Sequence, residues 1–191
     1  MAFTALLDAN VLYPVTLCDA LLRLADAEIY QVRWSEEILH EAERNLKAKY
    51  PSEKHASLDR RFAAMRKHFP EAMVVGHEAL IPAMTNHEDD RHVLAAAIRG
   101  RADVIVTSNV KHFPRAACKP YDIDAQRPDD FLCHQYDVRD PEYIMGVLEH
   151  WAAQLRHPPR TVEELVGLDL ARSAPKFCKK VLQFAQSRDP A

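Results

Sequence analysis

Glycine is scarce in this sequence, and its scarcity excludes two common nucleotide-binding motifs. Only four glycines occur among 191 residues, and they are far apart: Gly76, Gly100, Gly146 and Gly167. A phosphate-cradling P-loop and a GxGxxG fingerprint both need closely spaced glycines, because the backbone must turn tightly against the phosphate. The sequence therefore argues against a bound nucleotide cofactor.

Cysteine is equally sparse. The four cysteines include no CxxC pair: Cys18, Cys118, Cys133 and Cys178. Zinc ribbons and disulfide frameworks depend on closely or regularly spaced cysteines, so this distribution favours neither. We predict that all four are small buried residues with reduced thiols.

Long apolar runs are also absent. No run approaches the roughly 18 residues that a membrane span needs, and the N-terminal stretch MAFTALLDANV meets an acid too early for a signal peptide. These absences predict a cytoplasmic protein with no membrane attachment. With 48% hydrophobic and 28% charged residues, the chain fits one globular domain with room for an extension.

The charged residues are present but unevenly distributed. The net charge is -3, yet residues 44–67 hold eight Lys or Arg against two acids, and residues 91–119 hold six against one. A basic surface of this kind can bind the phosphates of a nucleic acid. Solvated helix faces explain the same pattern equally well, so charge alone does not decide.

Alternating strand and helix patterns predict an α/β fold. Four short apolar or β-branched runs are predicted strands, at residues 4–7, 30–34, 73–75 and 104–106. Amphipathic helical patterns lie between them, so the sheet is expected to be mainly parallel. Asn86, with Asp89 three residues later, is expected to cap the helix before the last strand. Beyond Pro120 no strand is predicted, which gives an α/β domain over residues 1–120 and a helical extension over 121–191.

Acidic and amide side chains are predicted to meet at one edge of this sheet. Asp8 and Asn109 follow two strands, Asp90 lies in the first turn of the helix before the second of them, and Glu41 borders the apolar stripe of its own helix. The carboxyl ends of parallel strands share one edge, so these four residues could share a pocket. Crowded carboxylates repel unless a cation compensates, and Mg²⁺ and Mn²⁺ prefer oxygen ligands. Such an ion activates water for phosphodiester hydrolysis.

Each of these residues also has a purely structural explanation. An acid after a strand is usually a turn residue, Glu41 alone is a solvated helix acid, and Asn109 can form an Asx-turn. A competing group of histidines lies nearby, at His87, His92 and His112. Their spacings of five and twenty residues match no helical zinc motif, which disfavours zinc.

Four segments in this order resemble the PIN-domain family of metal-dependent ribonucleases: LLDANVLYP, SEEILHEAERNL, DDRHVLAAAI and ADVIVTSNVKHFP. The resemblance covers roughly residues 3–115 and is strongest to VapC-type toxins of bacterial toxin-antitoxin pairs. It implies a PIN-like α/β/α sandwich, with the nuclease domain in residues 1–120. It also implies Mg²⁺ or Mn²⁺ in an acidic pocket, RNA as substrate, a small antitoxin protein as partner, and frequent homodimerisation.

The resemblance assigns roles to individual residues. Asp8, Glu41 and Asp90 are implied to be catalytic and to bind the metal, and Asn109 is implied to complete the catalytic group. The residues implied or expected to support the first-strand loop or to contact RNA are Asn10, Arg91, Thr107, Lys111, His112 and Arg115. Many relatives carry Asp at the position of Asn109 or of His112, and this chain carries neither, so a single tightly held metal is expected.

Two functions remain open from the sequence. The first is a metal-dependent endoribonuclease that acts as the toxin of a type II toxin-antitoxin pair. The second is a catalytically weakened PIN domain that serves as an RNA-binding or protein-interaction module, which Asn109 and His112 favour. A haloacid-dehalogenase-type phosphatase is disfavoured, because Asn10 stands where that chemistry needs a second acid.

Overall fold

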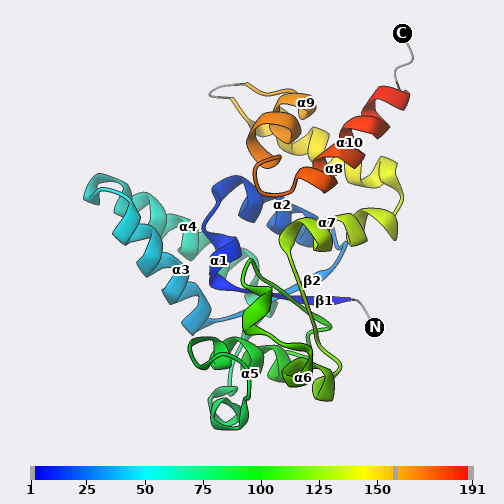
Figure 1. The fold of residues 1–191 in the computed structure, drawn as a ribbon. Helices are drawn as coiled ribbons and strands as arrows, with labels where there is room; N and C mark the ends of the chain where they lie inside the picture. Colours follow the sequence, from blue (N-terminus) through cyan, green and yellow to red (C-terminus); the bar gives the residue numbers. More distant parts are fainter. Residues whose placement is uncertain (1–2, 157–158, 189–191) are drawn as a thin grey trace. The chain divides into compact units, whose positions relative to one another are not determined.

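Figure 1 shows the computed structural model of the chain, which describes residues 3–156 and 159–188. The chain forms two compact units. Unit 1 comprises Met1–Tyr13 and Tyr30–Gln126, and unit 2 comprises Pro14–Ile29 and Arg127–Ala191. Unit 1 carries the predicted site, so it is described first.

A five-stranded parallel sheet forms the centre of unit 1 in the described part of the chain. Its strands are β1 (Thr4–Leu7), β2 (Gln31–Ser35), β3 (Met73–Val74), β4 (Val104–Val106) and β5 (Asp124–Gln126), in the order β3-β2-β1-β4-β5. Helices lie on both sides of this sheet. Every residue of β1 and β4 is buried, as expected for central strands covered on both faces. The predicted α/β fold is therefore confirmed.

The fifth strand corrects the sequence-based prediction. No strand was predicted beyond Pro120, yet β5 pairs with β4 along its length. The backbone nitrogen of Thr107 extends this ladder by donating to the carbonyl of Gln126 (2.9 Å). The residues of β5 are polar or small and partly exposed, so they lack the apolar pattern of a buried strand. The compact unit that contains the sheet includes β5 and ends at Gln126, and the domain boundary at residue 120 stays a prediction.

The helices of unit 1 are α1 (Ala9–Leu12), α3 (Glu36–Lys49), α4 (His55–His68), α5 (Arg91–Arg99) and α6 (Arg115–Cys118). Ser35 caps α3 as the sequence suggests, with its hydroxyl accepting from the nitrogen of Ile38 (3.3 Å). The prediction that Asn86 caps α5 was wrong. Its amide nitrogen instead donates to the carbonyl of Asp90 (3.0 Å), and a 3-10 turn at Glu88–Asp90 precedes the helix.

Helices α3 and α4 lie side by side as a hairpin (Figure 1). Ion pairs join them: Arg66 of α4 contacts Glu36 of α3 (2.5 Å), and Lys47 of α3 contacts Asp59 of α4. Two basic residues of the stretch 44–67 are therefore engaged within the hairpin. The basic surface available to a nucleic acid is smaller than the sequence count suggests.

The elements of unit 2 are α2 (Val15–Asp26), α7 (Pro128–Asp137), α8 (Pro141–Gln154), α9 (Val162–Glu164), a π-helical turn (Leu165–Leu170) and α10 (Pro175–Arg188). Phe131, Trp151 and Phe177 form its buried aromatic core. Thr161 and Glu164 form the predicted capping box of α9. Because α2 packs with α8, the helical unit includes a segment from the N-terminal part of the chain, which the predicted extension at 121–191 did not.

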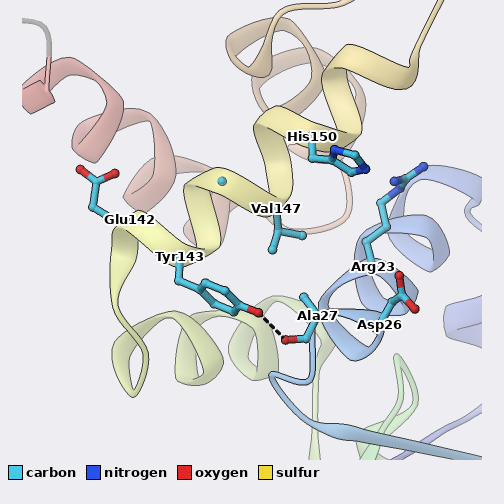
Figure 2. A pocket seen from close by; sticks show the side chains of 8 residues that line it. Arg23, Asp26, Ala27, Glu142, Tyr143, Val147 and His150 are labelled. Atoms are coloured by element: carbon cyan, nitrogen blue, oxygen red, sulfur yellow. Dashed lines mark hydrogen bonds between the residues drawn. The ribbon is translucent and has the colours of Figure 1, made fainter.

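Unit 2 contains a pocket of about 330 Å³ between α2 and α8 (Figure 2). Two of its lining residues are joined by a hydrogen bond, which the hydroxyl of Tyr143 donates to the carbonyl of Ala27 (2.9 Å). Gly146 lines this pocket, and a Cβ atom added there would meet nothing within 4 Å. None of the helices among the described residues has both the length and the apolar character required to cross a membrane.

Candidate active site

The order of the strands in the sheet indicates where a ligand site is expected. From β1 the sheet extends one way to β2 and β3, and the other way to β4 and β5. In open parallel sheets, ligands bind beyond the carboxyl ends of the strands at such a reversal. Asp8 follows β1, and the stretch 107–109 follows β4, so the fold brings these two predicted segments to the reversal point.

A hydrogen-bond network fixes the carboxylate of Asp8. The hydroxyl of Thr107 donates to Asp8 Oδ2 (2.6 Å), and the side-chain amide of Asn10 donates to the same oxygen. Asn10 also donates to Thr107 Oγ1 (3.0 Å) and accepts from the nitrogen of Ser108 (2.8 Å). Asn10, which was predicted to hold this loop, and Thr107, which was predicted to contact substrate, both hydrogen-bond to the Asp8 carboxylate with neutral groups.

Burial changes the pKa of the Asp8 carboxyl. The residue is only 2% exposed. The pKa of its carboxyl is raised from 3.8 to about 6, chiefly by removal from water and also by the negative charges of Asp90 and Glu41, against the lowering effect of the Thr107 hydrogen bond. The three predicted acids thus interact electrostatically, and the Asp8 carboxyl loses its proton at a higher pH than an exposed aspartate does.

Glu41 extends from α3 into a pocket of about 640 Å³ that Asp90 also lines. The hydroxyl of Tyr13 lies 3.4 Å from Glu41 Oε1, and His92 Nε2 lies 3.6 Å from Glu41 Oε2. Asn45, one helical turn beyond Glu41, donates to the same tyrosine hydroxyl. Glu41 is therefore partly buried and supported by polar groups, which a solvated helix acid would not be.

Asp90 is bonded to a histidine. His112 Nδ1 lies 2.6 Å from Asp90 Oδ2, and His87 Nδ1 lies 3.8 Å from the same oxygen. The rings of the two histidines are stacked, with centroids 4.1 Å apart and planes 13° apart. The structure thus places His112 beside the Asp90 carboxylate, and its contact with RNA stays a prediction.

The other predicted residues are exposed or partly exposed. The backbone nitrogen of Asn109 donates to Thr107 Oγ1 (3.0 Å), and the residue is exposed, with no side-chain hydrogen bond to the three acids among the described contacts. Lys111 and Arg115 are exposed. Arg91 Nε is buried and has no hydrogen-bond partner among the described residues, so it retains a donor.

Sequence reasoning missed Tyr13 and Asn45 and gave too little weight to His87. Asn45 could have been found from the sequence, because a residue four positions after Glu41 lies on the same helix face. Tyr13 and His87 carry no such signal, since their contacts depend on how loops pack in three dimensions.

The three acids have the chemistry that suits a divalent cation, but among the described residues their oxygens do not form a cluster of ligand atoms within 4.8 Å of one another. Asp8, Glu41 and Asp90 offer carboxylate oxygens, the ligands that Mg²⁺ and Mn²⁺ prefer. The polar groups bonded to Asp8 are neutral, and its pKa is raised, so the site has negative charge that its own hydrogen bonds do not balance. A bound cation would supply that balance.

Comparison with known proteins gives two family matches. The PIN domain profile matches residues 4–111, and the VapC50 C-terminal domain profile matches residues 128–183. A curated relative named "Putative ribonuclease VapC50", from Mycobacterium tuberculosis (strain ATCC 25618 / H37Rv), is 43% identical over 122 residues, which are 62% of this chain and 69% of the relative. No solved structure matches significantly.

Proposed function

The chain belongs to the PIN-domain family, and on this premise we propose that it is a metal-dependent endoribonuclease that hydrolyses RNA phosphodiester bonds. One observation carries the proposal: the buried carboxylate of Asp8, with a pKa raised to about 6, interacts with Glu41 and Asp90. Proteins avoid this arrangement unless function requires it, because buried carboxylates without a cation destabilise the fold. The match to a named ribonuclease supports the same substrate class.

Asp8, Glu41 and Asp90 are the proposed ligands of Mg²⁺ or Mn²⁺. When bound, such an ion lowers the pKa of water and stabilises negative charge on phosphate oxygens. Thr107 and Asn10 hold the Asp8 carboxylate in one orientation through their hydrogen bonds. Their role is positioning, since both contact Asp8 and each other.

Lys111, Arg115 and Arg91 are proposed to bind the RNA backbone. Lys111 and Arg115 are exposed cations, and Arg91 is partly exposed. Cations at these positions neutralise phosphates on either side of the cleaved bond. The exposed amide of Asn109 can hydrogen-bond to water or RNA without adding charge.

Membership of the VapC-like group extends the proposal to partners. We propose that the protein is the toxin of a type II toxin-antitoxin pair and that a small antitoxin protein holds it inactive. The match of residues 128–183 to the VapC50 C-terminal domain supports this group, since it covers most of unit 2. Homodimerisation and a cytoplasmic location remain predictions.

The test is cleavage of total cellular RNA by purified protein free of antitoxin. We expect scission with Mg²⁺ or Mn²⁺, none with EDTA, and loss of scission in Asp90→Asn. Glu88→Gln is the matched control, because Glu88 lies in the same 3-10 turn but is exposed. Cleavage by Asp90→Asn at the wild-type rate, or undiminished cleavage in EDTA, would reject the assignment.

A weakened PIN domain that binds RNA or protein without cutting it is the second candidate. The feature in its favour is that Asn109 and His112 add no negative charge beside the three acids, whereas the family resemblance implies an Asp at one of these positions. RNA binding with no scission under any divalent ion, from folded protein, would establish this candidate instead.

A further inference from the structure

His87, Asp90 and His112 form a cluster beside the carboxylate pocket. Each offers one ligand atom, and the three atoms lie within 4.8 Å of one another. Nitrogen and oxygen atoms on one zinc ion, each about 2.0–2.2 Å from the metal, lie roughly 3–3.5 Å apart. The observed distances to Asp90 Oδ2, 2.6 Å from His112 and 3.8 Å from His87, fall on either side of that range. To hold an ion, the His112–Asp90 contact would have to lengthen, and the two imidazole rings would have to turn so that both nitrogens face the metal.

The backbone already holds these residues together. The nitrogen of His87 donates to the carbonyl of His112 (3.1 Å), and the nitrogen of Asp90 donates to the carbonyl of His87 (3.0 Å). The side chain of Asn86 donates to the carbonyl of Asp90 (3.0 Å). The turn before α5 and the turn after β4 are thus joined at the same residues that carry the ligand atoms, so little ordering is needed on binding.

A simple ion pair between Asp90 and His112 does not explain the cluster. The chain contains such a pair on α3, where His40 Nε2 lies 2.9 Å from Glu36 with a single imidazole. At Asp90 a second imidazole is stacked on the first and directs its Nδ1 to the same oxygen. Two imidazoles and one carboxylate are a ligand set that suits zinc and neighbouring transition metals, whereas carboxylates alone suit magnesium.

We propose that His87, Asp90 and His112 form a binding site for a divalent transition-metal ion, with zinc preferred over magnesium. This site differs from the carboxylate pocket in its nitrogen ligands, although the two share Asp90. The proposal does not depend on ribonuclease activity, because it concerns metal binding by the folded protein.

Zn²⁺ titration of the full chain in competition with a chromophoric chelator tests the proposal. We expect one equivalent to bind, and affinity to fall at least about tenfold in His87→Ala and in His112→Ala, since loss of even a supporting residue costs that much. His40→Ala, which removes the imidazole of the ordinary ion pair, should bind as the wild type does. Co²⁺ gives a second readout, with visible ligand-field bands expected in the wild type and His40→Ala and lost in the other two variants.

Two results would overturn the proposal. One is equal Zn²⁺ affinity and an equal Co²⁺ spectrum in the wild type, His87→Ala and His112→Ala. The other is a loss of Zn²⁺ affinity in Asp8→Asn as large as in His87→Ala, because zinc would then occupy the carboxylate pocket. His87 has a side chain 43% exposed, so its truncation leaves the core intact and keeps the test decisive. RNA cleavage is not part of the readout, so failure of the nuclease proposal is distinguished from failure of this one.

Discussion

Replacing Asp8 by Asn should stabilise the metal-free protein, and the effect should depend on pH. The carboxyl pKa is raised from 3.8 to about 6 in the folded state, mainly by burial. An acid with a raised folded pKa binds its proton more tightly when folded, so stability falls as pH rises between these two values and stays low above them. At 1.36 kcal/mol per pKa unit, the ionised carboxylate costs about 3 kcal/mol at pH 8 and about half of that near pH 5.

The asparagine amide cannot ionise, so this cost disappears in the variant. Its NH₂ group cannot accept the hydrogen bonds that Thr107 and Asn10 donate to Oδ2, which offsets part of the gain. We expect Asp8→Asn to be more stable than the wild type by roughly 1–3 kcal/mol at pH 8 in EDTA, and no more stable near pH 4.

Urea unfolding followed by far-UV circular dichroism measures this difference. Runs at pH 4, 5 and 8 in EDTA give the pH dependence, and Glu88→Gln controls for the loss of any one surface charge. Added Mg²⁺ should stabilise the wild type and leave Asp8→Asn unchanged. The reasoning fails if Asp8→Asn is equal to or less stable than the wild type at pH 8, or if the difference between them is the same at all three pH values.

Four further predictions concern single side chains. Thr107→Val should lower the free energy of unfolding by about 1–3 kcal/mol, because its hydroxyl serves three hydrogen bonds, while Thr107→Ser should lose much less in the same urea assay. Asp129→Ala should destabilise by about 1–2 kcal/mol, since its carboxylate accepts from the nitrogens of Lys176 (3.1 Å) and Phe177 (2.9 Å) at the start of α10; equal stability of variant and wild type would contradict this. Gly146→Ala should raise stability by roughly 0.5–1 kcal/mol, because the added methyl meets open space within a helix; a lower melting temperature would show an unseen clash. Ellman's reagent should find no reactive thiol before unfolding, because all four cysteines are buried and burial raises the pKa of Cys178 to about 12; rapid labelling of the native protein would refute this.

The sheet could be predicted wherever strands are covered on both faces. β1 and β4 consist of continuous apolar residues because each is buried completely, and that pattern is visible in the sequence. β5 could not be predicted, since an edge strand of Asp, Ala and Gln is held by backbone hydrogen bonds to β4 and needs no apolar face. The position of α2 in unit 2 could not be predicted for a different reason. Its apolar stripe shows that one face is buried but does not specify which helices cover that face.

Some residues of the candidate site could also be predicted from the sequence, and others could not. Residues that follow strands, such as Asp8 and Thr107, were predictable because parallel strands deliver their carboxyl ends to one edge. The cap predicted for Asn86 failed, since a 3-10 turn displaces the start of α5 and turns the asparagine toward the carbonyl of Asp90. Spacing rules describe residues within one element and do not describe contacts between two turns.

The histidines show how contacts between two turns affect the inference about a bound metal. The spacings of five and twenty residues between His87, His92 and His112 match no helical zinc motif, and on that ground the sequence disfavoured zinc. In the fold, His92 faces Glu41 from α5, while the other two meet across the backbone hydrogen bond between His87 and His112. His112 places an imidazole against the Asp90 carboxylate. Because an imidazole ligand favours zinc and neighbouring transition metals over magnesium, His112 is compatible with an active metal site and is no sign by itself of a weakened nuclease.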